Sequence, residues 1–208
     1  MVRPVQLAWG IFLVLVALLA SAWSPYDRAT WWMEVFPVMV AVPLLWAYRH
    51  RFPLTHLLGI LIFWHALILI LGGTHTYARV PLGQWVADVM GWQRNPYDKL
   101  GHFFQGLVPA LLTREILSRS NGAPSRSWLR FLSVCVALAF SAFYELIEWW
   151  AALALGQGAD EFLGTQGDPW DTPSDMFLAL LGALVSVFLL GKWHDRQLRV
   201  GRSSHHPG

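Results

Sequence analysis

The chain has 208 residues, of which 55% are apolar and 13% are charged, and it contains 13 tryptophans. A soluble globular domain usually carries about twice this share of charged residues, so the composition excludes a disordered chain and a coiled coil. Cys135 is the single cysteine, which excludes a scaffold held together by intramolecular disulfides. The net charge of +2 comes without a basic, aromatic-rich surface, so we expect no nucleic-acid partner.

Six apolar stretches follow one another along the chain, and each is long enough, or nearly long enough, to cross a bilayer as a helix. They cover residues 5–23, 33–48, 54–71, 101–117, 129–155 and 174–191. Their lengths are wrong for the short alternating strands of a membrane barrel. The sequence therefore predicts an all-α fold, a polytopic transmembrane bundle of six helices. We expect a single domain over residues 1–200 and a disordered cytoplasmic tail at 201–208.

The lysines and arginines indicate the orientation of the bundle, because short loops rich in these residues stay in the cytoplasm. Eleven of the fifteen lie near one set of helix ends. The other helix ends carry four, namely Arg28, Arg79, Arg94 and Lys99. We therefore expect both termini in the cytoplasm of a bacterium, with the second set of ends facing the periplasm or exterior. The first stretch also resembles a signal peptide, with Ala20-Ser21-Ala22 as a cleavage site, and this alternative stays open.

Acidic residues gather at the predicted outer ends, and three of them, Glu34, Glu145 and Glu148, lie within or beside apolar stretches. Ionisable groups at membrane depth are costly and usually face a bundle interior or a watery cavity, so they mark candidate functional sites. Glu145 and Glu148 are three residues apart and share one side of a helix. Paired like charges favour a bound metal or acid–base chemistry. Glu148 also suits an interfacial position beside Trp149.

The fourth stretch is preceded by Asp98 and carries His102 and Gln105, whose i, i+4, i+7 spacing places all three on one helix face. A carboxylate and an imidazole one turn apart can bind one cation or relay protons. Asn95 and Pro96 also match a helix start, with Asn95 as the N-cap and Pro96 as the first helical residue. Capping explains Asp98, but it does not explain the His102 that shares its face.

A loop rich in glycine, proline and acidic residues leads into the sixth stretch. Its candidate side chains are Gln166, Asp168, Trp170, Asp171 and Asp175. Thr172 and Pro173 repeat the pattern of an N-cap followed by a first-turn proline. A solvated acidic loop is the alternative, but the alternation of carboxylates with glycine, proline and tryptophan favours a shaped loop.

Alternating helices would bring these residues together at the outer face. We expect Asp98, His102, Glu145 and Glu148 to be catalytic. A divalent metal of unknown identity would be held by Asp98, His102, Glu148, Asp171 and Asp175. Substrate contacts would come from Gln105, Tyr144, Gln166, Asp168 and Trp170. Glu34 and His65 are secondary candidates, although a single histidine in a bundle is more often a hydrogen-bond partner between helices. The helix N-termini at this face offer an anion site, so phosphoester chemistry is expected.

Four motifs carry a family resemblance. They are Tyr97-Asp98-Lys99-Leu100-Gly101-His102-Phe103, Phe143-Tyr144-Glu145-Leu146-Ile147-Glu148-Trp149, Gly164-Thr165-Gln166-Gly167-Asp168 with Trp170-Asp171 and Asp175-Met176, and Gly72-Gly73 with Thr76-Tyr77-Ala78 and Val80-Pro81. Together they resemble the YjdF-like family of bacterial inner-membrane proteins, a domain of unknown function. The resemblance implies a multi-pass inner-membrane protein and supplies no reaction. A weaker similarity of Asp98-Lys99-Leu100-Gly101-His102 to VanZ-like membrane proteins implies envelope or lipid-linked chemistry.

Three functions fit these observations. The first is a metal-dependent hydrolase or transferase acting on a lipid head group or phosphorylated lipid. The second is a small cation- or proton-coupled transporter, which would need more polar residues in the cytoplasmic half than Arg114 and Glu115. The third is a non-catalytic partner whose acidic face binds another envelope protein. The expected partners are the lipid bilayer and a lipid or lipid-linked substrate, and the sequence does not indicate an oligomeric state.

Overall fold

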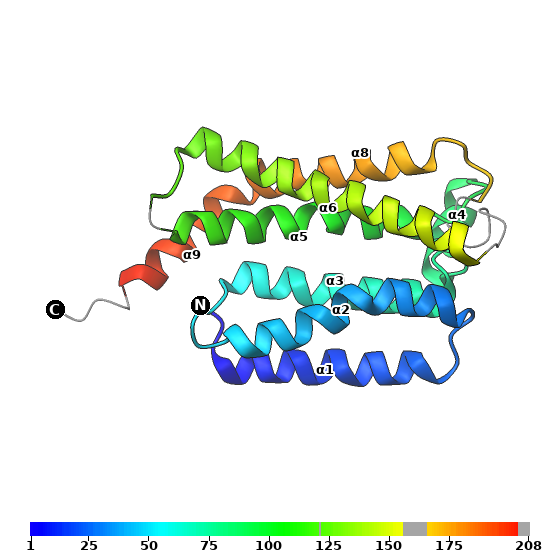
Figure 1. Ribbon diagram of the computed structural model, residues 1–208, viewed down its shortest axis with the longest axis horizontal. Coiled ribbons are helices and arrows are strands. Elements are labelled where there is room, and N and C mark those ends of the chain that lie inside the picture. The colour runs from blue at the N-terminus through cyan, green and yellow to red at the C-terminus, as the bar shows by residue number, and fades with distance from the viewer. Residues whose placement is uncertain (121, 156–165, 204–208) are drawn as a thin grey trace.

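The computed structural model describes residues 1–120, 122–155 and 166–203, and every regular element in these ranges is a helix. The elements are α1 (Pro4–Trp23), α2 (Arg28–Tyr48), α3 (His56–His75), α4 (Pro81–Met90), α5 (Tyr97–Arg119), α6 (Arg126–Leu155), α8 (Asp171–Leu184), the π-helix η1 (Val185–Leu189) and α9 (Gly191–Ser203). The long helices lie side by side, with the N-terminus and α9 at one end of the bundle and α4 at the other (Figure 1). We call these the α9 end and the α4 end.

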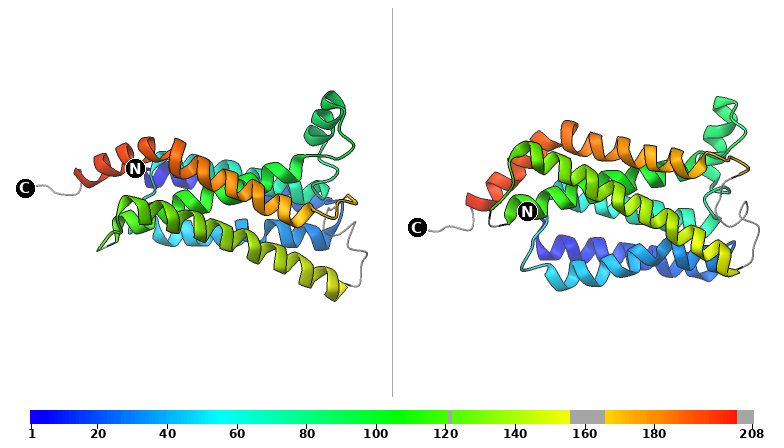
Figure 2. Two further views of the ribbon diagram at one scale, coloured as in Figure 1. Left: turned by 90° about the horizontal axis from the view of Figure 1, so that it is seen from above. Right: turned by 45° about the horizontal axis from the view of Figure 1, so that its top comes forward.

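The long helices form two groups of three that meet through α3 and α5. α1, α2 and α3 pack together, and α5 packs against both α6 and α8 (Figure 1). The most extensive contact in the described chain joins α5 and α8. Both of these helices begin at the α4 end, so they run parallel and present their N-termini together. The short helix α4 stands away from the long helices (Figure 2).

The outside of the bundle is apolar. Leu19 and Leu189 are each 72% exposed, and Phe131 is 57% exposed. In the described part of the chain, five helices are long and apolar enough to cross a membrane: α1, α2, α3, α6 and α8 with its π-helical continuation. An apolar surface of this extent suits hydrocarbon rather than water. The structure therefore confirms an all-helical membrane fold.

α5 differs from the five apolar helices. It has 23 residues, the length of a span, but it carries charged residues near both of its ends, at Asp98 and Lys99 and at Arg114 and Glu115. It is also the most enclosed helix of the bundle, because it packs against α3, α6 and α8. Its charged residues thus face protein rather than lipid.

Several helices begin earlier than the apolar stretches predicted. α2 begins at Arg28 rather than residue 33, because Asp27 caps it by accepting a hydrogen bond from Thr30 N at 2.7 Å. The fourth predicted helix, α5, begins at Tyr97, so Pro96 precedes the helix instead of opening it. Asn95 still caps locally, since its Oδ1 accepts from Tyr97 N at 3.0 Å. Polar first turns are invisible to a search for apolar residues, which explains the late predicted starts.

The start of α8 corrects a second expectation. α8 begins at Asp171, so Thr172 lies inside the helix and is not its N-cap. The Thr172 hydroxyl instead donates to Glu145 Oε2 at 2.9 Å. The threonine therefore joins α8 to α6.

Two further differences concern elements that the apolar stretches do not show. α4 has only 10 residues, although Pro81 at its first position and Gly91 at its end, with a φ of 68°, are ordinary helix boundary signals. The predicted sixth helix is interrupted after Leu184 by the π-helix, in which Leu190 N bonds to Val185 O at 3.1 Å. α9 extends through residue 203 into the predicted disordered tail, and 204–208 lie outside the described residues.

Candidate metal centre at the α4 end

Two close backbone contacts position the site. A side chain at Gly106 would overlap the carbonyl oxygen of Ala179, and one at Gly182 would overlap the carbonyl oxygen of Phe103. Glycine is therefore required where α5 crosses α8. Because the two helices are parallel and touch through their backbones, the first two turns of α5 lie against the first turns of α8.

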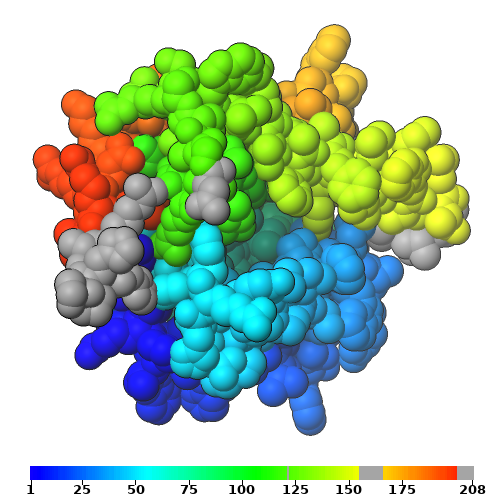
Figure 3. Space-filling view, turned by 60° about the vertical axis from the view of Figure 1, so that its left-hand side comes forward, coloured from blue at the N-terminus to red at the C-terminus, as the bar shows by residue number. Residues whose placement is uncertain are grey.

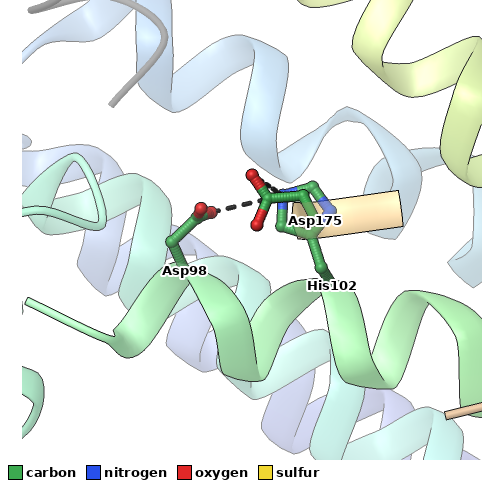
Figure 4. Close-up of side chains that lie close together, drawn as sticks. All are labelled: Asp98, His102 and Asp175. Atoms are coloured by element: carbon green, nitrogen blue, oxygen red, sulfur yellow. Dashed lines mark ion pairs between the residues drawn. The ribbon is translucent and has the colours of Figure 1, made fainter. Parts of the chain in front are cut away.

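Three predicted side chains from these turns converge (Figure 4). His102 Nε2 lies 3.4 Å from Asp98 Oδ1 and 3.9 Å from Asp175 Oδ2. One ligand atom of each residue lies within 4.8 Å of the other two. Ligands bound about 2.1 Å from a common ion lie roughly 3–3.5 Å apart, so small side-chain shifts would complete the geometry. Asp98, His102 and Asp175 form the triad that could hold a divalent cation.

Gln105 fixes the orientation of the histidine in this triad. Its Oε1 lies 2.8 Å from His102 Nδ1, so that nitrogen carries the hydrogen and donates it. In the neutral ring, Nε2 then presents a lone pair toward the oxygens of Asp98 and Asp175. A lone pair facing two carboxylates is unfavourable unless a proton or a metal ion lies between them. Gln105, predicted as a substrate contact, is therefore placed as the residue that orients His102.

Glu145 of α6 closes the triad on a third side. Its Oε1 lies 3.7 Å from His102 Nδ1 and has no hydrogen-bond partner among the described residues, although the side chain is only 9% exposed. Its other oxygen accepts from Thr172. A buried carboxylate oxygen without a donor costs free energy, typically 1–3 kcal/mol or more. A group bound beside His102 would provide a partner for this oxygen.

Glu148 and Glu34 lie on the α2 side of this cluster. Glu148 is half-buried, one turn beyond Glu145, within electrostatic range of Glu34 and His102. The buried Glu34 accepts a hydrogen bond from the Tyr144 hydroxyl at 3.2 Å. The predicted substrate contact Tyr144 therefore holds the secondary candidate Glu34, and both carboxylates extend the acidic lining toward α2.

Two basic residues neutralise the opposite side. Lys99 Nζ donates to Asp171 Oδ1 at 2.9 Å and to Asp175 Oδ1 at 2.6 Å. Arg94 forms ion pairs with Asp168 and, at 2.6 Å, with Asp171. Partial burial would lower the pKa of the Arg94 guanidinium, but the hydrogen bond and charge of Asp171 raise it, so Arg94 stays a cation. Asp171, a predicted metal ligand, is thus paired with two cations here, whereas Asp175 bridges Lys99 and the triad.

Arg94 and Lys99 are absent from the predicted site, although the sequence carried a signal for them. They are two of the four basic residues at the predicted outer ends, and both stand next to the acidic motif that begins at Asp98. Their place in the sequence, directly beside Asp98, indicates that they lie among the carboxylates and not only on the same side of the membrane.

The remaining loop candidates organise the backbone around the site. Gln166 Oε1 accepts from Asn95 N at 2.9 Å, and its Nε2 donates to Asn95 O at 3.1 Å. Asp168 pairs with Arg94 and accepts from Trp170 N at 2.9 Å, while the Trp170 side chain is 72% exposed. The motif residues Gly164 and Thr165, which precede Gln166, lie outside the described residues.

His65 is the one predicted site histidine outside the triad. It lies on α3 with its ring centroid 6.1 Å from that of Phe104, and its Nε2 has no hydrogen-bond partner in the described part of the chain. The structure gives it no ion pair with the carboxylates among the described residues, so it is not a member of the triad.

A second buried polar cluster lies at the α9 end, where the sequence indicated little. Glu115 and His194 are fully buried, and His194 Nε2 lies 2.8 Å from Glu115 Oε2. Thr55 donates to both Glu115 oxygens, through its backbone N at 3.0 Å and its hydroxyl at 2.6 Å. Arg114 reaches His194 Nδ1 at 2.7 Å and Asp195 at 2.6 Å. Only Arg114 Nε lacks a partner in this described cluster.

Comparison with known proteins agrees with this architecture. Residues 7–196 match a family described as "Predicted membrane protein (DUF2238)". The chain belongs to the DUF2238 family. Inner membrane protein YjdF of Escherichia coli (strain K12) is 58% identical to this DUF2238 chain over 197 residues, which cover 95% of the chain and 94% of YjdF. No solved structure matches this DUF2238 chain. The predicted YjdF-like membership is confirmed, and the DUF2238 chain is a multi-pass inner-membrane protein.

Proposed function

We propose that the cluster at the α4 end binds a divalent cation and uses it to hydrolyse or transfer a phosphate-containing lipid head group. In this proposal α5 is a sixth membrane-spanning helix, both termini are cytoplasmic and the site faces the outer leaflet. The distribution of lysine and arginine supports the orientation, because eleven of fifteen lie toward the α9 end. The burial of α5 among other helices supports its place in the membrane.

One observation carries the proposal. His102 Nε2 lies 3.4 Å from Asp98 Oδ1 and 3.9 Å from Asp175 Oδ2, while Glu145 Oε1 is buried beside the ring without a hydrogen-bond partner in the described chain. A divalent cation between His102 Nε2, Asp98 and Asp175 would be bound by all three residues, with the Glu145 carboxylate beside it. One histidine with several carboxylates suits Mn²⁺ or Zn²⁺.

The surrounding residues supply roles for phosphoester chemistry. Asp98, His102 and Asp175 would hold the cation, which when bound would supply Lewis-acid activation of a water and of a phosphoryl oxygen. Glu145 would act as the base that takes the proton of the water attacking phosphorus, and Glu148 would act as the acid that protonates the head-group oxygen as its P–O bond breaks. Lys99, whose Nζ donates to Asp171, Ser174 and Asp175, adds a positive charge beside the triad.

The test is turnover by detergent-purified protein on two probes, phosphatidic acid and phosphatidylglycerol, with Mn²⁺ or Zn²⁺ added. We expect release of phosphate or head group, loss of turnover with EDTA, and a drop of about 100-fold or more in Asp98→Asn and Glu145→Gln. Asp88→Asn is the control, because Asp88 is an exposed carboxylate of α4 bonded only to Gln84 in the described hydrogen-bond network. Turnover that survives EDTA, or that Asp88→Asn lowers equally, would contradict the proposal.

A cation- or proton-coupled transporter is the second candidate, because buried ionisable groups lie near both ends of α5. Glu115, His194, Arg114 and Asp195 add ionisable groups at the opposite end of the same helix α5. Proteoliposomes distinguish the two functions. Mn²⁺ or proton flux that Asp98→Asn abolishes, without lipid turnover, would favour transport over hydrolysis.

A further inference from the structure

A cavity of about 350 Å³ lies at the α9 end, far from the triad and formed by different helices. Its walls come from Leu44 and Leu45 of α2, the chain that joins α2 to α3, and Leu112 and Ile116 of α5. The N-terminal segment closes one side through Val2, whose backbone N donates to Leu54 O at 2.7 Å. The cavity is thus held by four parts of the chain.

The cavity opens on the lipid-facing surface. Leu44 is 52% exposed, Tyr48 is 54% exposed and Ile116 is 48% exposed, and all three line it. Viewed from this end, the surface is hollowed between the cyan atoms around the α2–α3 connection and the green atoms of α5 and α6 (Figure 3). A volume of this size falls in the range of ligand sites, roughly 300–1,000 Å³. Apolar walls at membrane depth suit a hydrocarbon chain.

The polar lining residues are Tyr48 and Arg49. The Arg49 guanidinium lies 4.0 Å from the Trp46 ring centroid and donates to Trp46 O at 2.5 Å. These two contacts hold the Arg49 guanidinium against Trp46, beside the cavity that Arg49 lines. A guanidinium has five N–H donors in a fork that matches phosphate oxygens, so Arg49 is placed to bind the phosphate of a lipid whose chain fills the cavity.

The charge around the cavity selects the class of lipid. Arg3 follows the lining residue Val2, Arg51 precedes the lining residue Phe52, and both arginines are exposed. The carboxylates described near this end, Glu115 and Asp195, are already paired with basic residues. The net charge around the cavity is therefore positive, and a positive charge complements an anionic head group.

We propose that this cavity binds one acyl chain of an anionic phospholipid from the leaflet at the α9 end, with Arg49 on its phosphate. The site is independent of the function proposed for the α4 end. Phosphatidylglycerol is the matching probe, and phosphatidylcholine, of similar shape and no net charge, is the comparison lipid.

The experiment is native mass spectrometry of delipidated protein titrated with phosphatidylglycerol or phosphatidylcholine. We expect one phosphatidylglycerol to bind in preference to phosphatidylcholine. Arg49→Gln should weaken phosphatidylglycerol about tenfold and phosphatidylcholine less than twofold, because a charge-assisted hydrogen bond is lost. Leu45→Trp, which fills the cavity, should abolish the bound lipid, and Leu112→Phe repeats this test from α5.

Arg79→Gln is the control, since Arg79 also stacks on an aromatic ring, 4.1 Å from the Tyr26 centroid, but away from the cavity. Equal weakening by Arg79→Gln would overturn the proposal. Equal binding of the two lipids to the wild type would overturn it as well. So would unchanged lipid binding in folded Leu45→Trp and Leu112→Phe, or a tightly bound polypeptide in place of lipid.

Discussion

The two ends of α5 carry the same kinds of residue, but these residues differ in how fully their hydrogen bonds are paired. At the α9 end, both Glu115 oxygens and both His194 nitrogens have hydrogen-bond partners. At the α4 end, His102 Nε2 faces two carboxylates and Glu145 Oε1 has no partner among the described residues. The clusters are about 18 Å apart along the helix, at a rise of roughly 1.5 Å per residue. The carboxylate and imidazole at the α9 end are thus satisfied within the protein, whereas the imidazole and Glu145 at the α4 end are not fully paired among the described residues.

This difference in hydrogen-bond pairing suggests different roles for the two clusters. A buried ionic network whose members satisfy one another stabilises one arrangement of helices, and here it joins α3, α5 and α9. A buried cluster with excess carboxylates is destabilised until a ligand neutralises it. We therefore infer that the cluster at the α9 end holds the helices of the bundle in place. The cluster at the α4 end, by the same inference, binds a cation. The following predictions test each half of this comparison.

The largest effect is expected at the complete cluster. Glu115→Ala removes the acceptor of Thr55, His194 and Arg119, which leaves buried donors without partners. Breaking a buried charged network costs about 3–5 kcal/mol. Thermal unfolding in detergent, followed by circular dichroism, measures this loss. A change below about 1 kcal/mol would show that the network does not hold the helices together.

The next effect is stabilisation by metal at the incomplete cluster. A cation that binds only the folded protein stabilises it by about 2.7 kcal/mol at one hundred times its Kd. We expect Mn²⁺ or Zn²⁺ to raise the melting temperature of the wild type and of Asp88→Asn, and not that of Asp98→Asn. The same rise in Asp98→Asn would place the ion elsewhere.

Without metal, the incomplete cluster should tolerate neutral substitutions. Asp98→Asn removes one of the two carboxylates that face His102 Nε2, so it costs less than about 1 kcal/mol in metal-free protein. Unfolding in EDTA, measured beside Glu115→Ala, gives the comparison directly. A loss as large as that of Glu115→Ala would mean that Asp98 is structural.

The smallest effect is expected for Arg94→Gln. The side chains of Arg94 and Asp168 are 27% and 30% exposed, so solvent screens their ion pair, and its loss should cost about 0.5 kcal/mol. The same unfolding assay measures it. A cost above about 2 kcal/mol would instead make Arg94 a main support of the α4 end.

Local pattern predicted part of the site. The shared face of Asp98, His102 and Gln105 follows from helical spacing alone, and the structure shows His102 in contact with both neighbours. The approach of Asp175, 73 residues further along the chain than His102, depends on Gly106 and Gly182 at the α5–α8 crossing. Spacing within one helix carries no information about such a pairing between helices.

The cluster at the α9 end also depends on pairing between helices, which spacing within one helix does not predict. Glu115 and Arg114 stood out in the sequence as charges in an apolar helix, but their partners His194 and Asp195 follow the last apolar stretch. α9 follows the π-helix, and its first turn brings His194 and Asp195 to the end of α5, which an apolar pattern does not show. The cluster could be recognised only when the helices were seen packed.

The most direct test is the metal content of tag-free protein purified from metal-replete cells, measured by elemental analysis in wild type, Asp98→Asn, Asp175→Asn and Asp88→Asn. We predict one Mn or Zn per chain in wild type and Asp88→Asn, and a loss of about tenfold or more in the other two, since each loses a ligand. Equal metal content in all four proteins, or none in a folded wild type dialysed against Mn²⁺ and Zn²⁺, would contradict the account.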